Sequence, residues 1–176
     1  MTNRFIMTAF GKDRPGIVAD VTKILYENGC NLEDNTMTLL ADEFTLVLLF
    51  SSAGSDVEEQ LSRECRRLEK EKGISAFMRP LEQRQELKKK GSLNYTLHVE
   101  GMDQAGIVYK ISQFLSDSSV NILDLKSKVT AAPGSGTPLY MMDIDIQMPP
   151  GFTAEKLEEG LSSVADELNV DISISR

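Results

Sequence analysis

The chain has 176 residues, of which 41% are hydrophobic and 26% are charged, so it can bury a core and does not have the composition of a disordered polypeptide. Its formal net charge of −8 disfavours broad attachment to nucleic acid or anionic membranes, because those surfaces attract clustered Lys and Arg. Cys30 and Cys65 form no CxxC pair, and there is neither a signal-peptide core nor a membrane-spanning apolar run. We expect a cytoplasmic protein with reduced thiols, without membrane attachment or direct nucleic-acid binding.

A repeated segment organises the chain. Residues 11–18 read GKDRPGIV, and ninety positions later residues 101–108 read GMDQAGIV. The match continues without a gap to Asn31 and Asp34 in the first copy and to Asn121 and Asp124 in the second. A duplication of about half the length predicts two small domains. We expect these domains over residues 1–80 and 92–176, joined by the polar and charged linker 81–91.

The first half predicts six elements in chain order. An apolar run that ends at Gly11 suits a buried strand, and helical spacing of apolar residues follows from Ile17 until Asn28-Gly29. We expect Asp13 to cap this helix and Pro15 to lie in its first turn. A hairpin, a second helix and a last strand complete the half. The expected strands cover residues 3–10, 31–40, 44–50 and 74–78, and the second helix runs from about Val57 to Gly73.

The second half repeats this order, with Thr153 expected to cap its second helix. The order strand, helix, strand, strand, helix, strand predicts an α+β, ferredoxin-like fold, in which an antiparallel four-stranded sheet carries two helices on one face. The open faces of the two sheets should differ, because Val47 and Leu49 point outward in the first half where Asp143 and Asp145 do so in the second. We expect the more apolar first face to be covered by the other domain or by a second subunit.

Catalytic and metal sites find little support in the sequence. The single histidine, His98, lies within a strand pattern and is expected to be structural. There is no CxxC or HxxxH spacing for a metal, and no Lys-Ser/Thr follows Gly16 or Gly106 as a nucleotide phosphate loop requires. We therefore expect no enzymatic activity, no metal and no cofactor.

The function that the sequence still supports is ligand binding at the repeated turn. The glycines permit close approach of a ligand to the backbone, and the free N–H groups near residues 14–17 at the start of a helix suit a carboxylate. Asn31 and Asp34 add amide and carboxylate groups that could meet an ammonium and a carboxylate. The alternative stays open that the glycines only make the turn, that Asp13 only caps the helix, and that Asn31 is a turn residue.

Residues 13–35, DRPGIVADVTKILYENGCNLEDN, followed by two strands, a helix and a strand, resemble an ACT domain, a regulatory amino-acid-binding module with this βαββαβ fold. Two such domains in tandem are similar to the glycine cleavage system transcriptional repressor family. Those proteins are acidic and act on a DNA-binding activator without binding DNA themselves. The first motif is also close to the N-terminal module of formyltetrahydrofolate deformylase, but no deformylase catalytic domain follows it here.

The resemblance implies a non-enzymatic, amino-acid-sensing regulatory protein that contacts a transcription factor or a metabolic enzyme. Glycine and serine are the first ligand candidates, and tandem pairing or a homodimer is expected, with ligands at the interface. A ligand-independent interaction module and a regulatory subunit of an amino-acid metabolic enzyme are the alternatives. In the second copy Gln104-Ala105 replaces Arg14-Pro15, which leaves its ligand in question. The implied contacts are Asp13, Arg14, Pro15, Gly16, Ile17, Asn31 and Asp34, with Asp103, Gln104, Ala105, Gly106, Ile107, Asn121 and Asp124 as their equivalents.

Overall fold

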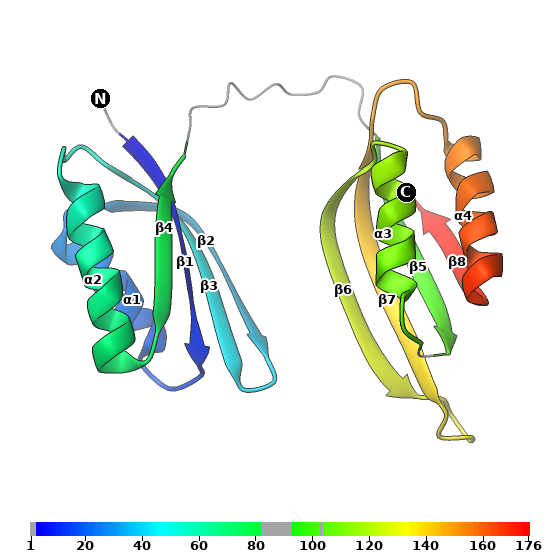
Figure 1. Cartoon of the computed structure of the whole chain (residues 1–176), viewed down its shortest axis with the longest axis horizontal. Coiled ribbons are helices and arrows are strands. Elements are labelled where there is room, and N and C mark those ends of the chain that lie inside the picture. The colour runs from blue at the N-terminus through cyan, green and yellow to red at the C-terminus, as the bar shows by residue number, and fades with distance from the viewer. Residues whose placement is uncertain (1–2, 82–92, 103) are drawn as a thin grey trace. The chain divides into compact units, whose positions relative to one another are not determined.

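The computed structural model describes residues 3–81, 93–102 and 104–176. They fall into two compact units, one for each sequence repeat (Figure 1). Of the predicted linker 81–91, only Leu81 lies within the described residues, so the limits of the linker stay a prediction. Asp103, one of the implied ligand contacts, also lies outside the described residues.

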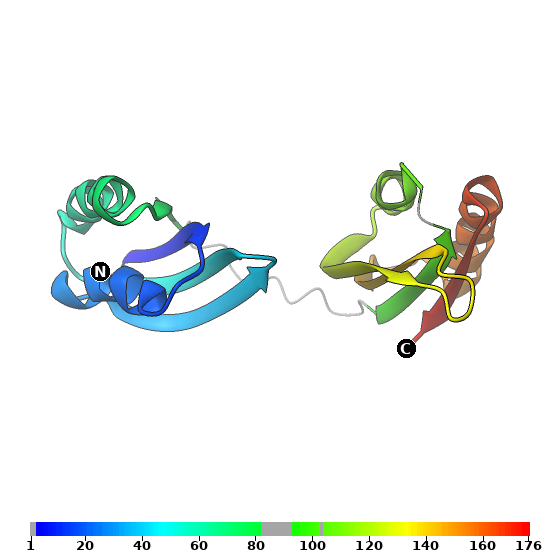
Figure 2. The same cartoon turned by 90° about the horizontal axis from the view of Figure 1, so that it is seen from below.

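Each unit has the element order that the sequence predicts. The sheets are antiparallel, with strand orders β2-β3-β1-β4 and β6-β7-β5-β8, and each carries two helices on one face (Figures 1 and 2). The predicted pair of ferredoxin-like βαββαβ domains is thereby confirmed. Domain 1 comprises β1 (Asn3–Lys12), α1 (Ile17–Glu27), β2 (Asn31–Leu40), β3 (Glu43–Ser52), α2 (Val57–Lys72) and β4 (Ser75–Pro80), and domain 2 comprises β5 (Leu93–Met102), α3 (Ile107–Asp117), β6 (Asn121–Ala131), β7 (Pro138–Met148), α4 (Ala154–Leu168) and β8 (Val170–Ser175).

The core of each domain lies between the sheet and its helices. In β3 every second residue from Phe44 to Phe50 is buried, and the apolar stripe of α1 packs onto this face. Burying one such side chain contributes about 1.5–3 kcal/mol relative to leaving it in water. Domain 2 builds an equivalent core from β5, β7, α3 and α4. The two periodicities visible in the sequence therefore fix which face of each element is inside.

The open faces of the two sheets differ as predicted. Val47 and Leu49 of β3 are half-buried on the open face of domain 1, and Phe77 of β4, on the other side of β1, is exposed. In domain 2 the matching residues of β7, Asp143 and Asp145, are exposed carboxylates. What covers the apolar face of domain 1 stays a prediction.

The strands β2 and β6 each form one edge of their sheets, and β4 and β8 form the opposite edges. All ten residues of β2 are exposed, and the strand pairs on one side only, with β3. Both β2 and β6 also have a β-bulge at the matching position, between Leu32 and Asp34 in β2 and between Ile122 and Asp124 in β6. An exposed edge presents unpaired backbone groups that can accept another strand.

The start of α1 differs from the expectation. The helix begins at Ile17, and its N-cap is Gly16, not Asp13. Pro15 therefore lies in the turn before the helix and not in its first helical turn. The physical reason is the left-handed conformation of Gly16, which lets the chain reverse direction one residue before the helix starts.

Candidate functional site

The repeated turn has the same backbone in both domains. Gly16 and Gly106 adopt left-handed conformations, with φ of 86° and 96°, immediately before α1 and α3. An L side chain is strained in this region, so glycine is needed at both positions for the turn itself. The backbone N–H of Asp13 donates to the carbonyl of Asp42 at 2.8 Å, which ties the first turn to the β2–β3 hairpin.

The turn leaves backbone donors free at the start of α1. The N–H of Ile17 donates to the carbonyl of Arg14 at 3.3 Å, and that of Asp20 donates to the carbonyl of Gly16 at 2.9 Å. Between them, the N–H groups of Val18 and Ala19 have no backbone acceptor among the described residues. These donors lie at the positive end of the helix dipole, so this end of the helix favours an anionic group.

Arg14 brings a cation to the same turn. Its Nη2 atom lies 2.6 Å from Oδ2 of Asp20, and its Nη1 atom donates to the carbonyl of Pro15 at 3.4 Å. Lys72, at the end of α2, lies 3.8 Å from the other oxygen of Asp20. The Arg14 hydrogen bond, with smaller contributions from Lys72 and Lys23, holds the pKa of the Asp20 carboxyl below its usual value against the opposing effect of burial.

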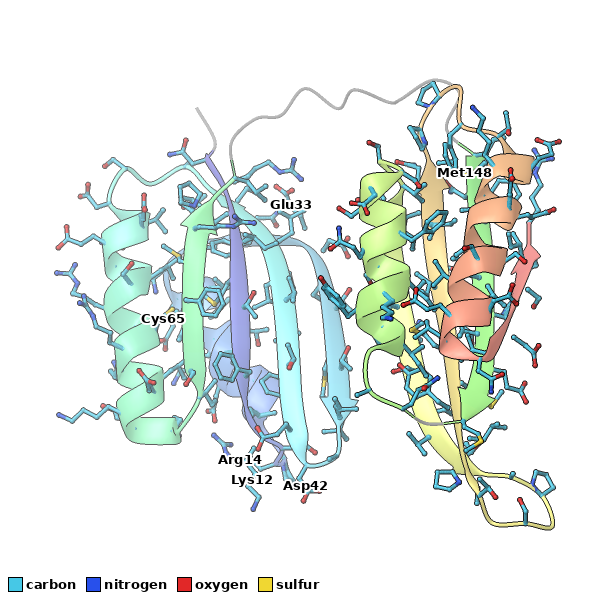
Figure 3. The ribbon with its side chains drawn as sticks, turned by 45° about the vertical axis from the view of Figure 1, so that its right-hand side comes forward. Lys12, Arg14, Glu33, Asp42, Cys65 and Met148 are labelled. Carbon is cyan, nitrogen blue, oxygen red and sulfur yellow. The ribbon has the colours of Figure 1, made fainter. Side chains whose placement is uncertain are left out.

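Asn31 and Asp34 lie at the other end of domain 1. Asp34 pairs with Leu49, which lies opposite Ile6 in β1, six residues before the end of that strand. At about 3.3 Å per residue, Asp34 is therefore roughly 20 Å from the turn along the sheet. Figure 3 shows this separation, since Arg14 lies with Asp42 at one end and Glu33, the neighbour of Asp34, lies at the other. One domain alone does not bring the two halves of the predicted site together.

The second turn keeps the backbone but carries different side chains. Gln104, at the position of Arg14, donates its side-chain amide to the carbonyl of Leu168 at the end of α4. Lys110, at the position of Asp20, pairs with Glu167. Both contacts join the second turn to the end of α4. Residues 101–108 contain no arginine. Ala105 and Gly106 complete the turn, and Ile107 starts α3. Asn121 starts β6, and Asp124 pairs with Asp145, which lies opposite Thr96, six residues before the end of β5, so both are far from the turn, as in domain 1.

The matching carboxylates after the two bulges have different neighbours. Asp34 accepts a hydrogen bond from the backbone N–H of Asn35 at 2.8 Å. Asp124 instead lies 2.6 Å from Nζ of Lys126, and this ammonium holds the pKa of Asp124 below its usual value. No local pattern predicts the bulges, but the two-residue spacing of Asp124 and Lys126 does predict a charged pair on one face of a strand.

Sequence reasoning also missed Asp20 and Lys72. Asp20 lies outside the apolar stripe that predicts the helix. Its separation of six residues from Arg14 matches no regular spacing of side-chain pairs. Lys72 approaches Asp20 only because the end of α2 returns to the start of α1, so no local pattern could find it.

The single histidine lies outside both turns. His98 is exposed on the open face of domain 2, where Nδ1 lies 2.7 Å from Oδ1 of Asp143 and Nε2 lies 2.9 Å from Oγ of Ser175. Strand register places Asp143 directly beside His98, and Ser175 lies two residues beyond Ser173, the residue of β8 that pairs with His98. Within the part of the chain that the structure describes, no group of three or more His, Cys, Asp or Glu could hold a metal ion, and no helix could cross a membrane.

Comparisons with known proteins agree with this architecture. The ACT domain profile matches residues 3–79. The glycine cleavage system transcriptional repressor of Escherichia coli is 25% identical over 173 residues, which cover 97% of this chain and 88% of that protein. A UPF0237 protein of Methanopyrus kandleri is 36% identical over 76 residues, which cover 43% of this chain and 84% of that protein.

Solved structures extend the likeness to the whole chain. A protein of unknown function from Galdieria sulphuraria matches with a TM-score of 0.82 and 28% identity, over 99% of this chain and 98% of that one. A putative glycine cleavage system transcriptional repressor matches with a TM-score of 0.73 and 22% identity, over 99% and 97% of the chains, which shows the shared fold. Through residues 3–79 the chain therefore belongs to the ACT domain family, and as a whole it is a tandem ACT-like protein related to glycine cleavage system transcriptional repressors.

Proposed function

We propose that this protein is a non-enzymatic sensor of a small amino acid, with glycine and serine as the first candidates, and that ligand binding changes its contact with a protein partner such as a transcriptional activator. The observation that carries the proposal is the turn of domain 1. There the free N–H groups of Val18 and Ala19 and the guanidinium of Arg14 surround the positive end of α1. A carboxylate is the group that such a set of donors recognises.

A second copy of the chain supplies the rest of this site. Asn31 and Asp34 are too far from the turn of their own domain, but β2 is an exposed edge strand. If two β2 strands pair antiparallel over their full lengths, Asn31 of one copy lies beside Leu40 of the other. The adjoining hairpin residue Asp42 holds the turn at Asp13, so the ammonium-binding groups of one copy approach the carboxylate-binding turn of its partner.

Calorimetric titration of the full chain with a panel of amino acids tests the sensor. We expect glycine or serine to bind, and we expect Gly16→Val and Asn31→Ala each to weaken binding by about tenfold or more. Val at position 16 strains the left-handed turn and crowds the ligand, and Asn31→Ala removes a contact worth on the order of 1.4 kcal/mol. Asn121→Ala is the matched control in the second repeat and should leave binding unchanged. Absence of binding by every amino acid, or binding indifferent to both domain 1 substitutions, would overturn the proposal.

The association state tests the shared site independently. Analytical ultracentrifugation should show a dimer, and replacing Met37, which is 46% exposed in the middle of β2, by Pro should give monomers, because Pro removes a backbone donor and disfavours strand pairing. The same substitution should abolish binding. A monomeric wild-type chain that binds glycine or serine would refute the site between two copies.

Domain 2 favours a second role, that of a ligand-independent interaction module. The observation that favours it is Gln104, whose amide is already engaged with the end of α4, at a turn without arginine. We expect one bound amino acid per chain rather than two. A calorimetric stoichiometry of two per chain would contradict this assignment.

A further inference from the structure

Asp20 connects the candidate site to two different elements of domain 1. Its carboxylate contacts Arg14 of the turn at 2.6 Å and Lys72 of α2 at 3.8 Å. The side chain of Asp20 is 24% exposed and that of Arg14 is 38% exposed, so solvent and small solutes reach this ion pair. A carboxylate is thus already bound to the cation of the turn when no ligand is present.

The position of the guanidinium makes this occupancy relevant to the ligand. Nη1 of Arg14 lies 3.4 Å from the carbonyl of Pro15 and 4.0 Å from the place that a Cβ atom would take at Gly16. The guanidinium therefore covers the turn from which the free N–H groups of α1 emerge. A guanidinium offers a planar fork of donors that fits a carboxylate, so Asp20 and an incoming carboxylate compete for the same face.

The second repeat lacks both members of this pair. Gln104 takes the place of Arg14, and Lys110 takes the place of Asp20. Both are engaged with the end of α4, through Leu168 and Glu167. A carboxylate at this position of the helix is therefore found in the repeat whose turn carries an arginine, whereas the second repeat has Lys110 there, paired with Glu167 of α4.

We propose that Asp20 stands in for the ligand carboxylate: it holds the Arg14 guanidinium over the turn when no ligand is bound, and the carboxylate of the amino acid displaces it. Lys72 remains beside Asp20 after the exchange, so the displaced carboxylate keeps a counter-ion. Asp20 thus sets the affinity of the turn for carboxylates. This inference rests on the proposed function and assigns to the same site an internal competitor.

Calorimetry on the full chain with glycine, and with acetate as a carboxylate that lacks an ammonium group, tests the exchange. Asp20→Asn removes the competing charge at nearly constant shape, and we expect both probes to bind about three- to fivefold more tightly, which is the scale of a partly exposed ion pair. Arg14→Gln reproduces the second repeat and should weaken both probes. In the double variant, Asp20→Asn should bring no gain, because the cation for which it competed is gone.

Glu27→Gln is the matched control, since it removes the same charge from the same helix, and among the described residues Glu27 pairs with exposed Lys23 at 3.6 Å. Its affinities should stay within about 1.5-fold of the wild type, as expected for an exposed pair. Thermal unfolding confirms that each variant is folded.

The outcomes separate the two proposals. If the wild type binds but Asp20→Asn does not bind more tightly, or if the gain persists with Gln at position 14 or is equalled by Glu27→Gln, the competitor role is wrong and the sensor proposal stands. If neither probe nor serine binds to the wild type or to Asp20→Asn, the sensor proposal fails and this inference fails with it.

Discussion

The two domains share one backbone but present different surfaces. Thr8 and His98 lie ninety positions apart at the same place in the central strands, and their partners are Val47 in domain 1 and Asp143 in domain 2. The neighbouring outward positions carry Leu49 and Asp145. The duplicated fold therefore constrains the inward-facing residues, while the outward-facing ones are free to specialise, one face for apolar contact and the other for water.

The helices of the two domains also pack differently. In domain 2 the ring of Phe114 lies against Gly160, where an added Cβ would be only 2.3 Å from the ring. The corresponding residues of domain 1 are Ile24 and Glu64, which line a groove of about 250 Å³ between α1 and α2. Domain 2 thus fills with an aromatic ring the space that domain 1 leaves open to solvent.

The largest effect should come from the core positions that the domains share. Leu61 in α2 and Leu157 in α4 are both fully buried, and replacing either by Ala should cost about 2–5 kcal/mol. Because each belongs to its own core, Leu61→Ala should destabilise domain 1 alone and Leu157→Ala domain 2 alone. Hydrogen exchange followed by mass spectrometry, with peptides assigned to each domain, measures the two effects separately.

Tyr26→Ala is the control for that experiment, because Tyr26 is 84% exposed and its removal should stay within about 0.5 kcal/mol. Equal loss of protection in both domains from one core substitution would show that the domains unfold as a single unit.

The contact between Phe114 and Gly160 predicts a smaller loss. Gly160→Val should destabilise domain 2 by about 2 kcal/mol, since overpacking against the ring exceeds the gain in helix propensity. Phe114→Leu should restore part of the loss in the double variant by making room. Urea denaturation gives both values. A neutral Gly160→Val would mean that the ring moves out at no cost and that the packing difference between the domains has little energetic weight.

Local patterns in the sequence were enough to predict the fold. The alternation in β3 and the spacing of apolar residues in α1 specify which face is buried, and the repeat applies both to the second half. The helix cap was predicted at Asp13 because Asp caps many helices, but the left-handed Gly16 took that position. The backbone geometry of Gly16 outweighs the capping preference of Asp13, because the chain reverses direction at residue 16.

The candidate site was predictable only in part. Gly16 and Arg14 stand out because they belong to a repeated, polar segment at the start of a helix. The Arg14–Asp20–Lys72 contacts depend on how α2 ends beside α1, and the distance of Asp34 from the turn depends on strand register. Long-range contacts of this kind are set by tertiary packing, which no local pattern encodes.

The two domains should also differ in how their stability depends on pH. Domain 1 has Cys65 in its core, whereas domain 2 has no cysteine and carries Leu161 at the matching position. Burial against the sheet raises the pKa of the Cys65 thiol from 9.0 to about 11 (Figure 3). The neutral thiol therefore contributes stability that is fully present below about pH 9 and is lost as the pH rises toward 11.

At pH 10 this loss should amount to about 1.4 kcal/mol, the equivalent of one pH unit above the unfolded pKa. Urea denaturation between pH 7 and 11 should show that the stability difference between the wild type and Cys65→Ala shrinks above pH 9, with other titrating groups cancelling in the difference. A constant difference up to pH 11 would show that the thiol is less buried than its 5% exposure indicates.

The smallest expected change in stability concerns the N-caps of α2 and α4. Thr153 caps α4, because its hydroxyl oxygen accepts the N–H of Lys156 at 3.4 Å, whereas Asp56 makes no such bond before α2 within the described part of domain 1. We expect Thr153→Ala to cost about 1 kcal/mol, and Asp56→Ala to cost less than about 0.5 kcal/mol. Thr153→Ser should retain most of the stability, since it keeps the acceptor. Urea denaturation measures these losses. Both helices have acidic residues in the first turn, so helix-end electrostatics are shared by the two domains. Equal losses at Thr153 and Asp56 would therefore mean that the Thr153 hydrogen bond contributes nothing beyond these electrostatics.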